Sequence, residues 1–535
     1  MTLSLLDLGE DILLQLSTHL TPSQIFKLFT LNKQLYSIFS HSNSIYNLLY
    51  RKLFNTTYPI TSTQNWKEIF YTRVSSQQVF TWGESNGGRL GYLSTSIPQE
   101  SLIRNFGWYV HTPSHIPEFD NFIIIDILAT GFNFIFLLDN GEIWYSGIAR
   151  NGYRNISPGP KEKDYIGRIE NDHVAARRNL GVIPMPLMSQ RYQIPKDEEN
   201  NDLKWRQKSK TVPSNNNFLS KFEIMGHPHV VSISCGREHL IALTDTNELY
   251  TWDSGNSNKI GIKLTFPSID SSYTILKICA GWNSSAILVE NVGLVIIYRR
   301  EALTKEQFEN HHFTTDAKYI ILPNSKNNIV DLTVGNNYIL YISKSDNSLC
   351  MFTFNPDNLS SETSITELRS SIKKLDKFNN WKTQFEKHIE FTKVSSNFNN
   401  FIIFTNHDQI LFGHSEDVEN IIVHDELQGR NIVSIEIGDY HYLALTSSGD
   451  IFSWGIESKC CGCLGLGSKE EVKQKVTDET IVIDEGNGLR VTKPLIVKKP
   501  GNGKWIGIAA GGWHSAGIFV PDEPKKEQES DKSEA

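Results

Sequence analysis

The sequence has no surplus of positive charge. Its 535 residues contain 52 lysines and arginines against 60 aspartates and glutamates, which gives a formal net charge of -8. Proteins that hold DNA or RNA neutralise the phosphate backbone with clustered basic side chains. We therefore expect no nucleic-acid partner.

Long hydrophobic runs are also missing. The longest apolar stretch, residues 122–138, is interrupted by Asp126, Gly131 and Asn133, and Asp7 and Glu10 break the apolar N-terminus. A membrane-spanning helix needs about 20 apolar residues, and a signal peptide begins with a basic region. We expect no membrane segment and no signal peptide.

Cysteine is scarce. The chain has six cysteines, and three of them stand together in KCCGCLGLG, residues 459–467. So few cysteines in so long a chain do not make a disulfide framework, which favours a reducing compartment. We therefore expect a cytoplasmic or nuclear location, or both.

The motifs of common enzyme sites that we sought are absent as well. The sequence has no His-Glu-x-x-His metal motif, no P-loop, and no dinucleotide fingerprint between a strand and a helix. His311 and His312 have no cysteine or carboxylate nearby at a metal-ligand spacing. We expect no catalytic residue, no metal and no cofactor, so the chain is not expected to be an enzyme.

A strand-like phrase recurs through most of the chain. Each copy has an apolar stretch, a small marker residue, two or three further residues and a second apolar stretch, as in SISCGREHLIAL (232–243) and SIEIGDYHYLAL (434–445). Such alternation and short apolar runs are typical of buried strands. The seven copies have their markers at Gly131, Gly236, Gly281, Gly335, Asn397, Gly438 and Gly511.

A second strand phrase, often closed by Trp-Gly, follows most copies of the first. Six copies follow the marker phrases, and a seventh, QVFTWG (78–83), stands alone before them. Sheets stacked radially bury both apolar faces and leave only short edges. We therefore predict a seven-bladed β-propeller in which the strand at 79–83 completes the sheet begun at 507–518.

The marker residues suggest two structural roles. Glycine suits a position that needs a positive φ or that lies close to a neighbouring strand. Three copies carry a histidine three residues after the marker, at His239, His441 and His514. One histidine on each of several separate sheets favours a structural residue that bonds its own blade over a metal ligand.

Two stretches resemble the regulator-of-chromosome-condensation propeller family. TWGESNGGRLGY (81–92) is similar to that family's Trp-Gly strand and Gly-x-Leu-Gly turn, and ISCGREHLIALT (233–244) to its Cys-Gly-x-x-His strand. KCCGCLGLG is then the same turn lengthened by two residues, with its cysteines a reactive or incidental thiol cluster rather than a metal site. The resemblance implies a propeller and, as one alternative function, a guanine-nucleotide exchange factor for a small GTPase.

The first fifty residues have a helical pattern instead. Leu8, Ile12, Leu16 and Leu20 recur at every fourth position, which makes one apolar stripe. Thr21 as N-cap and Pro22 at the first helical position then predict a second helix. Three or four short helices bury too little surface to be stable alone, so a leftover apolar face is a docking surface or a helical cap on the propeller.

This segment resembles an F-box. The resemblance rests on LDLGEDILLQLSTHLTPSQIFKLFTLNKQLYSIF (6–39) and NWKEIFYTR (65–73), with Gly9 where the family usually has proline and Leu35 where it often has tryptophan. It implies binding of a Skp-type adaptor and, through it, a cullin. Carried over residue by residue, the adaptor contacts would be Leu8, Gly9, Ile12, Leu13, Leu16, Leu20, Ile25, Leu28 and Leu31, some of which must be the F-box's own core.

The expected fold is therefore a small all-α N-terminal F-box followed by an all-β seven-bladed propeller. The expected function is the substrate-recognition subunit of an SCF-type ubiquitin ligase with an unknown protein substrate; an exchange factor, an unrelated enzyme and a purely structural propeller are the alternatives. The predicted parts are an F-box at 1–55, a helical linker at 56–78, a propeller at 79–520 with inserts at 150–225, 355–390 and 468–504, and a disordered tail at 521–535.

Overall fold

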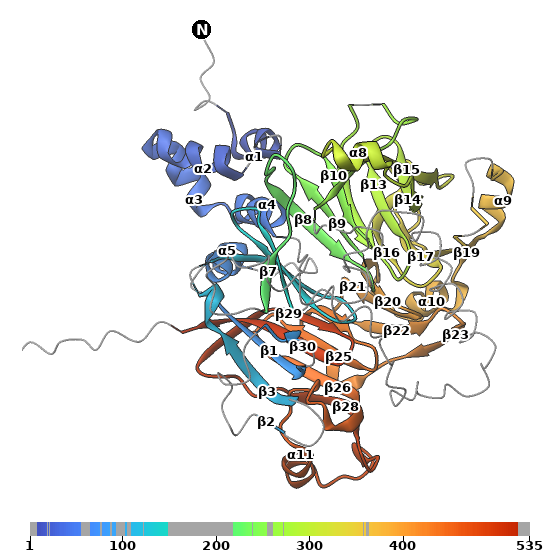
Figure 1. Cartoon of the computed structure of the whole chain (residues 1–535). Coiled ribbons are helices and arrows are strands. Elements are labelled where there is room, and N and C mark those ends of the chain that lie inside the picture. The colour runs from blue at the N-terminus through green and yellow to red at the C-terminus, as the bar shows by residue number, and fades with distance from the viewer. Residues whose placement is uncertain are drawn as a thin grey trace, which may run out of the picture. The chain divides into compact units, whose positions relative to one another are not determined.

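A computed structural model gives the fold (Figure 1). It describes residues 8–18, 20, 22–54, 65–74, 77–85, 88–91, 102–103, 109–120, 122–147, 218–237, 239–253, 260–270, 272–356, 358–359 and 363–522. The predicted tail beyond 522 and most of the predicted insert at 150–225 lie outside these residues. Within the described part, no helix has the length and apolarity needed to cross a membrane.

Short helices form the N-terminal part, as the sequence pattern predicts. They are α1 (Glu10–Thr18), α2 (Pro22–Leu31), α3 (Lys33–His41), α4 (Asn43–Leu53) and α5 (Trp66–Val74). Helix α2 begins at the predicted proline, and α3 and α4 begin after Asn32 and Ser42, whose side chains accept hydrogen bonds from Leu35 N and Ile45 N. Such N-caps fix where short helices start.

Every copy of the marker phrase folds as an antiparallel hairpin, which confirms the strand prediction. The hairpins are β4 (Ile124–Ala129) with β5 (Phe134–Leu138), β8 (Val230–Cys235) with β9 (Leu240–Thr244), β12 (Ile275–Ala280) with β13 (Ser285–Val289), β16 (Ile329–Val334) with β17 (Tyr338–Ser343), β20 (Phe391–Asn397) with β21 (Asn400–Thr405), β24 (Ile432–Ile437) with β25 (His441–Thr446), and β29 (Gly503–Gly511) with β30 (His514–Pro521).

The second phrase supplies the next strand of each sheet. These strands are β6 (Ile143–Ser146), β10 (Leu249–Trp252), β14 (Gly293–Arg300), β18 (Leu349–Thr353), β22 (Ile410–His414), β26 (Ile451–Glu457) and, before all the others, β1 (Gln78–Glu84). Outer strands complete the sheets: β2 (Leu102–Ile103), β3 (Tyr109–Ile116), β7 (Leu219–Lys221), β11 (Ile262–Thr265), β15 (Thr314–Ile321), β19 (Ile372–Lys374), β23 (Asp417–Ile422), β27 (Val482–Asp484) and β28 (Leu489–Ile496).

The strands form six hydrogen-bonded sheets in the part of the chain that the structure describes. One sheet has eight strands, because β11 pairs in parallel with β15 and so joins the strands β8–β11 to β12–β15. The first strands of the hairpins also contact one another in turn: β4 with β8, β8 with β12, β12 with β16, β16 with β20, β20 with β24, β24 with β29, and β29 with β4. This cycle of contacts buries both faces of the sheets.

The two ends of the repeat meet in one sheet, as predicted. Strand β1 lies between β3 and β30, and its pairing with β30 runs from Gln78 opposite Phe519 to Gly83 opposite His514 (Figure 1). Trp82 on β1 is fully buried and donates a hydrogen bond from Nε1 to the carbonyl of Cys463, at 3.0 Å. The first and last strands of the repeat thus complete each other.

The marker residues act through close approach and not through a positive φ. Gly236 has an ordinary φ, but a Cβ there would collide with the carbonyl of Gly281 on the next hairpin. In the first hairpin the marker position belongs to Thr130 and not to Gly131. Its N–H donates to the carbonyl of Asn133, as that of Gly236 donates to His239. The marker predicted for this copy, Gly131, was therefore wrong by one residue.

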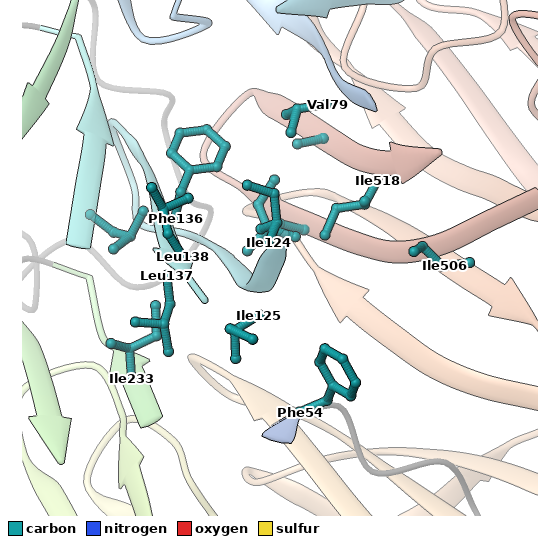
Figure 2. Packing of buried hydrophobic residues seen from close by; sticks show 14 of the residues in the cluster. Phe54, Val79, Ile124, Ile125, Phe136, Leu137, Leu138, Ile233, Ile506 and Ile518 are labelled. Atoms are coloured by element: carbon teal, nitrogen blue, oxygen red, sulfur yellow. The ribbon is translucent and has the colours of Figure 1, made fainter. Parts of the chain in front are cut away.

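Arg73 on α5 ties the helical segment to the sheets. This arginine is 2% exposed and donates to the carbonyls of Ile125 on β4 (2.8 Å) and Ile506 on β29 (3.2 Å). Its guanidinium also lies over the ring of Phe54, which packs toward Ile125 and Ile506 (Figure 2). The helices are thus anchored in the first half of two inner strands.

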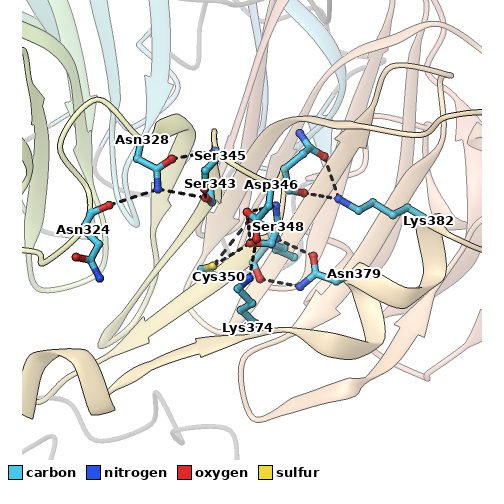
Figure 3. A network of polar contacts seen from close by, with 12 residues as sticks. Asn324, Asn328, Ser343, Ser345, Asp346, Ser348, Cys350, Lys374, Asn379 and Lys382 are labelled. Carbon is cyan, nitrogen blue, oxygen red and sulfur yellow. Dashed lines mark hydrogen bonds and ion pairs between the residues drawn. The ribbon is translucent and has the colours of Figure 1, made fainter.

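The insert at 355–390 is ordered where it is described. It contains two short helices, α9 (Ile365–Ser370) and α10 (Asp376–Lys382), with strand β19 between them. Lys374 pairs with Asp346 at 2.6 Å, and Asn379 bonds the backbone of Leu349 in both directions (Figure 3). These contacts fix the insert to the β17–β18 turn. In the insert at 468–504, α11 (Lys469–Lys475) precedes β27 and β28.

The closing sheet predicts a large cost for losing Trp82. In Trp82→Ala, the empty volume beside Trp505 and the lost hydrogen bond to Cys463 should lower the free energy of unfolding by about 3–5 kcal/mol, measured by urea denaturation. Trp381→Ala, which removes a half-buried tryptophan from α10, is the matched control and should cost much less. Equal losses for the two variants would contradict the role given to the closing strand.

Candidate protein-docking surface

Helix α1 presents apolar side chains on two sides. Leu13 is 2% exposed and Ser17, four residues later, is fully buried. Ile12 and Leu16 are also four residues apart but are 44% and 43% exposed. Residues at this spacing share one helix face, so α1 buries one face in the bundle and turns a second apolar face to solvent.

The core of the helical segment is complete without these exposed residues. Aromatic rings fill it: Phe29 lies 5.5 Å from Phe39, and Tyr46 lies 5.7 Å from Phe70. Lys52 Nζ donates to the carbonyl of Thr18 at 2.8 Å, which joins α4 to the end of α1. The core therefore does not need Ile12 and Leu16, which remain as extra apolar side chains on the surface.

The structure sorts the nine predicted adaptor contacts into three groups. Leu13 and Ile25 are core residues, with 2% and 0% exposure. Leu8, Leu20 and Leu28 are half-buried against the core. The exposed members are Gly9, Ile12, Leu16 and Leu31, the last of them 64% exposed at the end of α2. Only the exposed and half-buried residues are available to a partner.

Two further apolar side chains of this segment were missed by the sequence reasoning. Phe26 on α2 is 39% exposed, and Tyr36 on α3 is 57% exposed. Both interrupt the leucine spacing that guided the prediction. Only the structure shows that these two side chains are exposed beside a filled core, and this exposure identifies them as part of the apolar surface.

The repeat histidines hold neighbouring hairpins together. His441 Nε2 bonds Ser515 Oγ on β30 at 2.7 Å, and His239 Nε2 bonds Ser285 Oγ on β13 at 2.9 Å. In one of the copies without histidine, Tyr338 OH donates to the carbonyl of Asn400 on β21. The prediction that these residues bond their own blade was wrong, because each bond crosses to the next hairpin.

The marker glycine and the ring three residues later form one unit. A Cβ at Gly438 would collide with the imidazole of His441, and a Cβ at Gly335 with the ring of Tyr338. The ring therefore takes the space that the glycine leaves. Burial lowers the pKa of His441 to about 3, so this imidazole is neutral at physiological pH.

The turn KCCGCLGLG has a structural role, because it contacts the first and last strands of the repeat. The Cys463 carbonyl accepts hydrogen bonds from Trp82 Nε1 on β1 and Ser515 Oγ on β30, and a Cβ at Gly465 would clash with Trp82. Burial raises the pKa of the Cys460 and Cys463 thiols. Raised thiol pKa values disfavour the reactive thiolate, so for these two cysteines the incidental interpretation fits.

Metal-ligand chemistry finds no support in the described residues. No three histidine, cysteine, aspartate or glutamate side chains among them converge on a point that could hold an ion. The cysteine turn and the repeat histidines bond within the chain, whereas the exposed apolar side chains of the N-terminal helices are left for a partner to cover.

Parts of the chain match a known repeat. The family model described as Regulator of chromosome condensation (RCC1) repeat matches residues 230–252, which span β8 to β10, and 432–463, which span β24 to β26 and the first part of the cysteine turn. These two stretches therefore carry RCC1-type repeats.

Two curated proteins are similar over most of their length. SCF-associated factor 1 of Saccharomyces cerevisiae is 26% identical over 572 residues, covering 86% of this chain and 85% of that protein. F-box protein pof9 of Schizosaccharomyces pombe is 25% identical over 437 residues, covering 75% of this chain and 86% of that protein.

A solved structure shares the fold. The crystal structure of Kap60 bound to yeast RCC1 (Prp20) contains a chain that is 14% identical, with a TM-score of 0.50, covering 84% of this chain and 90% of that one. With the repeats and the relatives, this supports an F-box protein with an RCC1-like β-propeller. The resemblance inferred from the sequence is confirmed.

The cross-sheet histidine predicts a pH effect on stability. The pKa of His441 falls from 6.5 in the unfolded chain to about 3 in the folded one. The unfolded state therefore binds the proton first, and stability is lost as the pH falls below 6.5. Replacing His441 by Gln removes this loss, so the destabilisation by His441→Gln should shrink by about 2 kcal/mol between about pH 7 and about pH 5.

Urea unfolding of both proteins at the two pH values measures this change. His388→Gln is the matched control, because the His388 side chain is 85% exposed. A cost of His441→Gln that stays constant with pH would contradict a buried neutral imidazole.

Proposed function

We propose that this chain is the substrate-recognition subunit of an SCF-type ubiquitin ligase. The N-terminal helices bind a Skp-type adaptor and, through it, a cullin; the propeller binds the protein to be ubiquitylated for proteasomal degradation. The observation that carries the proposal is the exposed apolar face of Ile12 and Leu16 on a helical bundle whose core is already filled.

The relatives support this assignment. The names of the two similar proteins, SCF-associated factor 1 and F-box protein pof9, connect them with an F-box and with SCF. The exposed leucine and isoleucine side chains suit a partner surface that is also apolar, since burying them contributes roughly 25 cal/mol per Å².

In this role the chain contributes position and not chemistry. Partner proteins catalyse ubiquitin transfer, and the receptor raises the effective concentration of substrate lysines near the transferring enzyme. Arg73 connects the helices that bind the adaptor to the sheets that bind the substrate, because its two hydrogen bonds hold α5 against β4 and β29.

We further propose that the propeller has seven blades, with the parts bounded as the sequence analysis predicts. The seven first strands that contact one another in turn support this number. The eight-stranded sheet is then two blades joined through the β11–β15 pair. A cytoplasmic or nuclear site, or both, agrees with the six free cysteines.

A guanine-nucleotide exchange factor is the second candidate, favoured by the RCC1 repeats and the shared fold. Stimulated release of a fluorescent guanine nucleotide from a small GTPase would promote it. No stimulation by the full chain, together with adaptor binding, is the result expected from the receptor assignment.

The adaptor surface predicts which substitutions abolish binding. Ile12→Asp and Leu16→Asp place a charge on the exposed face and should weaken binding of a purified Skp adaptor by at least about 30-fold, the scale of an interface hot spot. Both variants should keep the wild-type melting temperature, because neither side chain is in the core. Leu8→Asp is expected to weaken binding as well.

Two controls make the test specific. Ile365→Asp changes an isoleucine that is 62% exposed on α9, outside the proposed surface, and should leave adaptor binding unchanged. Leu13→Asp should unfold the helical segment. Adaptor binding by Ile12→Asp and Leu16→Asp at wild-type strength, or by a chain without residues 1–55, would refute the proposal.

A further inference from the structure

The hairpin loops at one end of the inner strands carry a cluster of aromatic side chains. They are Phe132, Trp282, Phe398, Tyr440 and Trp513, which we call the aromatic collar. Phe398 and Tyr440 are each 41% exposed, and the other three are half-buried. Large aromatic residues in this state are typical of the centres of protein interfaces.

The collar is organised before any partner binds. Trp282 and Phe398 lie 4.5 Å apart, and Tyr440 stacks on Trp513 at 4.9 Å. Backbone hydrogen bonds connect successive loops, such as Asn336 N to the Phe398 carbonyl at 2.8 Å. A rigid surface loses little conformational entropy on binding.

Charges at the collar are paired within the chain. Arg237 forms an ion pair with Asp439 and lies over the rings of Phe132 and Trp282, at 5.0 and 4.9 Å. Arg89 also lies over the Phe132 ring, at 5.9 Å, and pairs with Glu84 at 3.0 Å. A charged partner segment would have to break one of these pairs, so the collar suits an uncharged apolar segment.

The backbone at Phe398 points to a function. Its φ of 52° is a left-handed conformation that a bulky residue rarely adopts. In the equivalent two-residue loop between β29 and β30 this position is Gly512, with a φ of 38°. Glycine is the usual residue there, so the chain holds a phenylalanine ring at the surface against the preference of its backbone.

The collar is also at the end of the strands away from the helical segment. Arg73 bonds Ile125 and Ile506 near the starts of β4 and β29, whereas the collar loops follow the ends of these strands at Ala129 and Gly511. Ala129 follows Ile125 by four residues and Gly511 follows Ile506 by five, which places the collar loops about 13–17 Å along the strands from the Arg73 bonds. A partner on the collar therefore leaves the helical surface open.

We propose that the aromatic collar is the docking surface for the protein to be ubiquitylated, and that it takes an uncharged segment of that protein with large apolar side chains. This inference rests on the proposed function. It assigns the recognition face of the propeller to the marker loops and gives Phe398 the central contact.

The test uses defined peptides and the full chain. Random peptides of about twelve residues, displayed on phage, are selected for binding, and the selected sequences are synthesised for fluorescence-anisotropy titration. The expected sequences are rich in Leu, Met and aromatic residues and poor in charge. Phe398→Asn should weaken their binding by at least about tenfold while keeping or raising the melting temperature, because asparagine tolerates a positive φ.

Phe385→Asn is the matched control. Phe385 is 43% exposed and packs on Trp381 at 4.6 Å, much as Phe398 packs on Trp282, but it lies in the insert after α10. This variant and Ile12→Asp should bind the peptides like the wild type. Phe398→Asn should in turn bind the Skp adaptor like the wild type, so a failure of the adaptor assignment is seen separately from a failure of the collar.

Several results would overturn the proposal. They are selection of charged peptides, failure to select any peptide, or binding that Phe398→Asn leaves intact. Self-association of the chain that sedimentation detects and that Phe398→Asn abolishes would assign the collar to a second copy of this chain instead.

Discussion

The pairing of β1 with β30 is the constraint on which the rest of the structure depends. Strand β1 precedes the first hairpin by some forty residues and completes the sheet of the last one, so it joins the two ends of the repeat in the sheet whose first strand, β29, contacts β4. The cysteine turn contacts the same two strands, since the Cys463 carbonyl accepts hydrogen bonds from both Trp82 on β1 and Ser515 on β30. Because β1 follows directly after α5, closing the propeller also brings Arg73 to the start of β4 and β29. The sheet that joins the two ends of the repeat therefore also holds α5.

Contacts between neighbouring sheets follow a second rule. The marker position lies close to the next hairpin, and the ring three residues later covers it and bonds the next sheet, as His441 does with Ser515 and Tyr338 with Asn400. A neutral imidazole at His441 fits this site because no charge has to be buried. The other residues of these loops differ from copy to copy, and the collar is built from them. The same short loop therefore supplies both the hydrogen bond to the next hairpin and the exposed residues of the collar.

Sequence reasoning could predict what depends on local periodicity. The hairpins, the closing strand and the start of α2 at Pro22 all follow from strand alternation, repeat spacing and helix-capping rules. It could not sort Ile12 from Leu13, because both are apolar and the helix packing decides which one faces the core. Nor could it find the partners of His239 and His441, which are serines 46 and 74 residues away. The shift from Gly131 to Thr130 had a local cause, since the threonine hydroxyl accepts the N–H groups of Phe132 and Asn133.

The central claim is that the exposed face of α1 and α2 is where an adaptor binds, while the sheets remain available to a substrate. Hydrogen–deuterium exchange of the full chain, with and without a purified Skp adaptor, measures this directly. The account predicts slower exchange in peptides covering residues 8–31 and unchanged exchange in the collar loops. Protection of the collar loops by the adaptor, or no protection of residues 8–31, would contradict it.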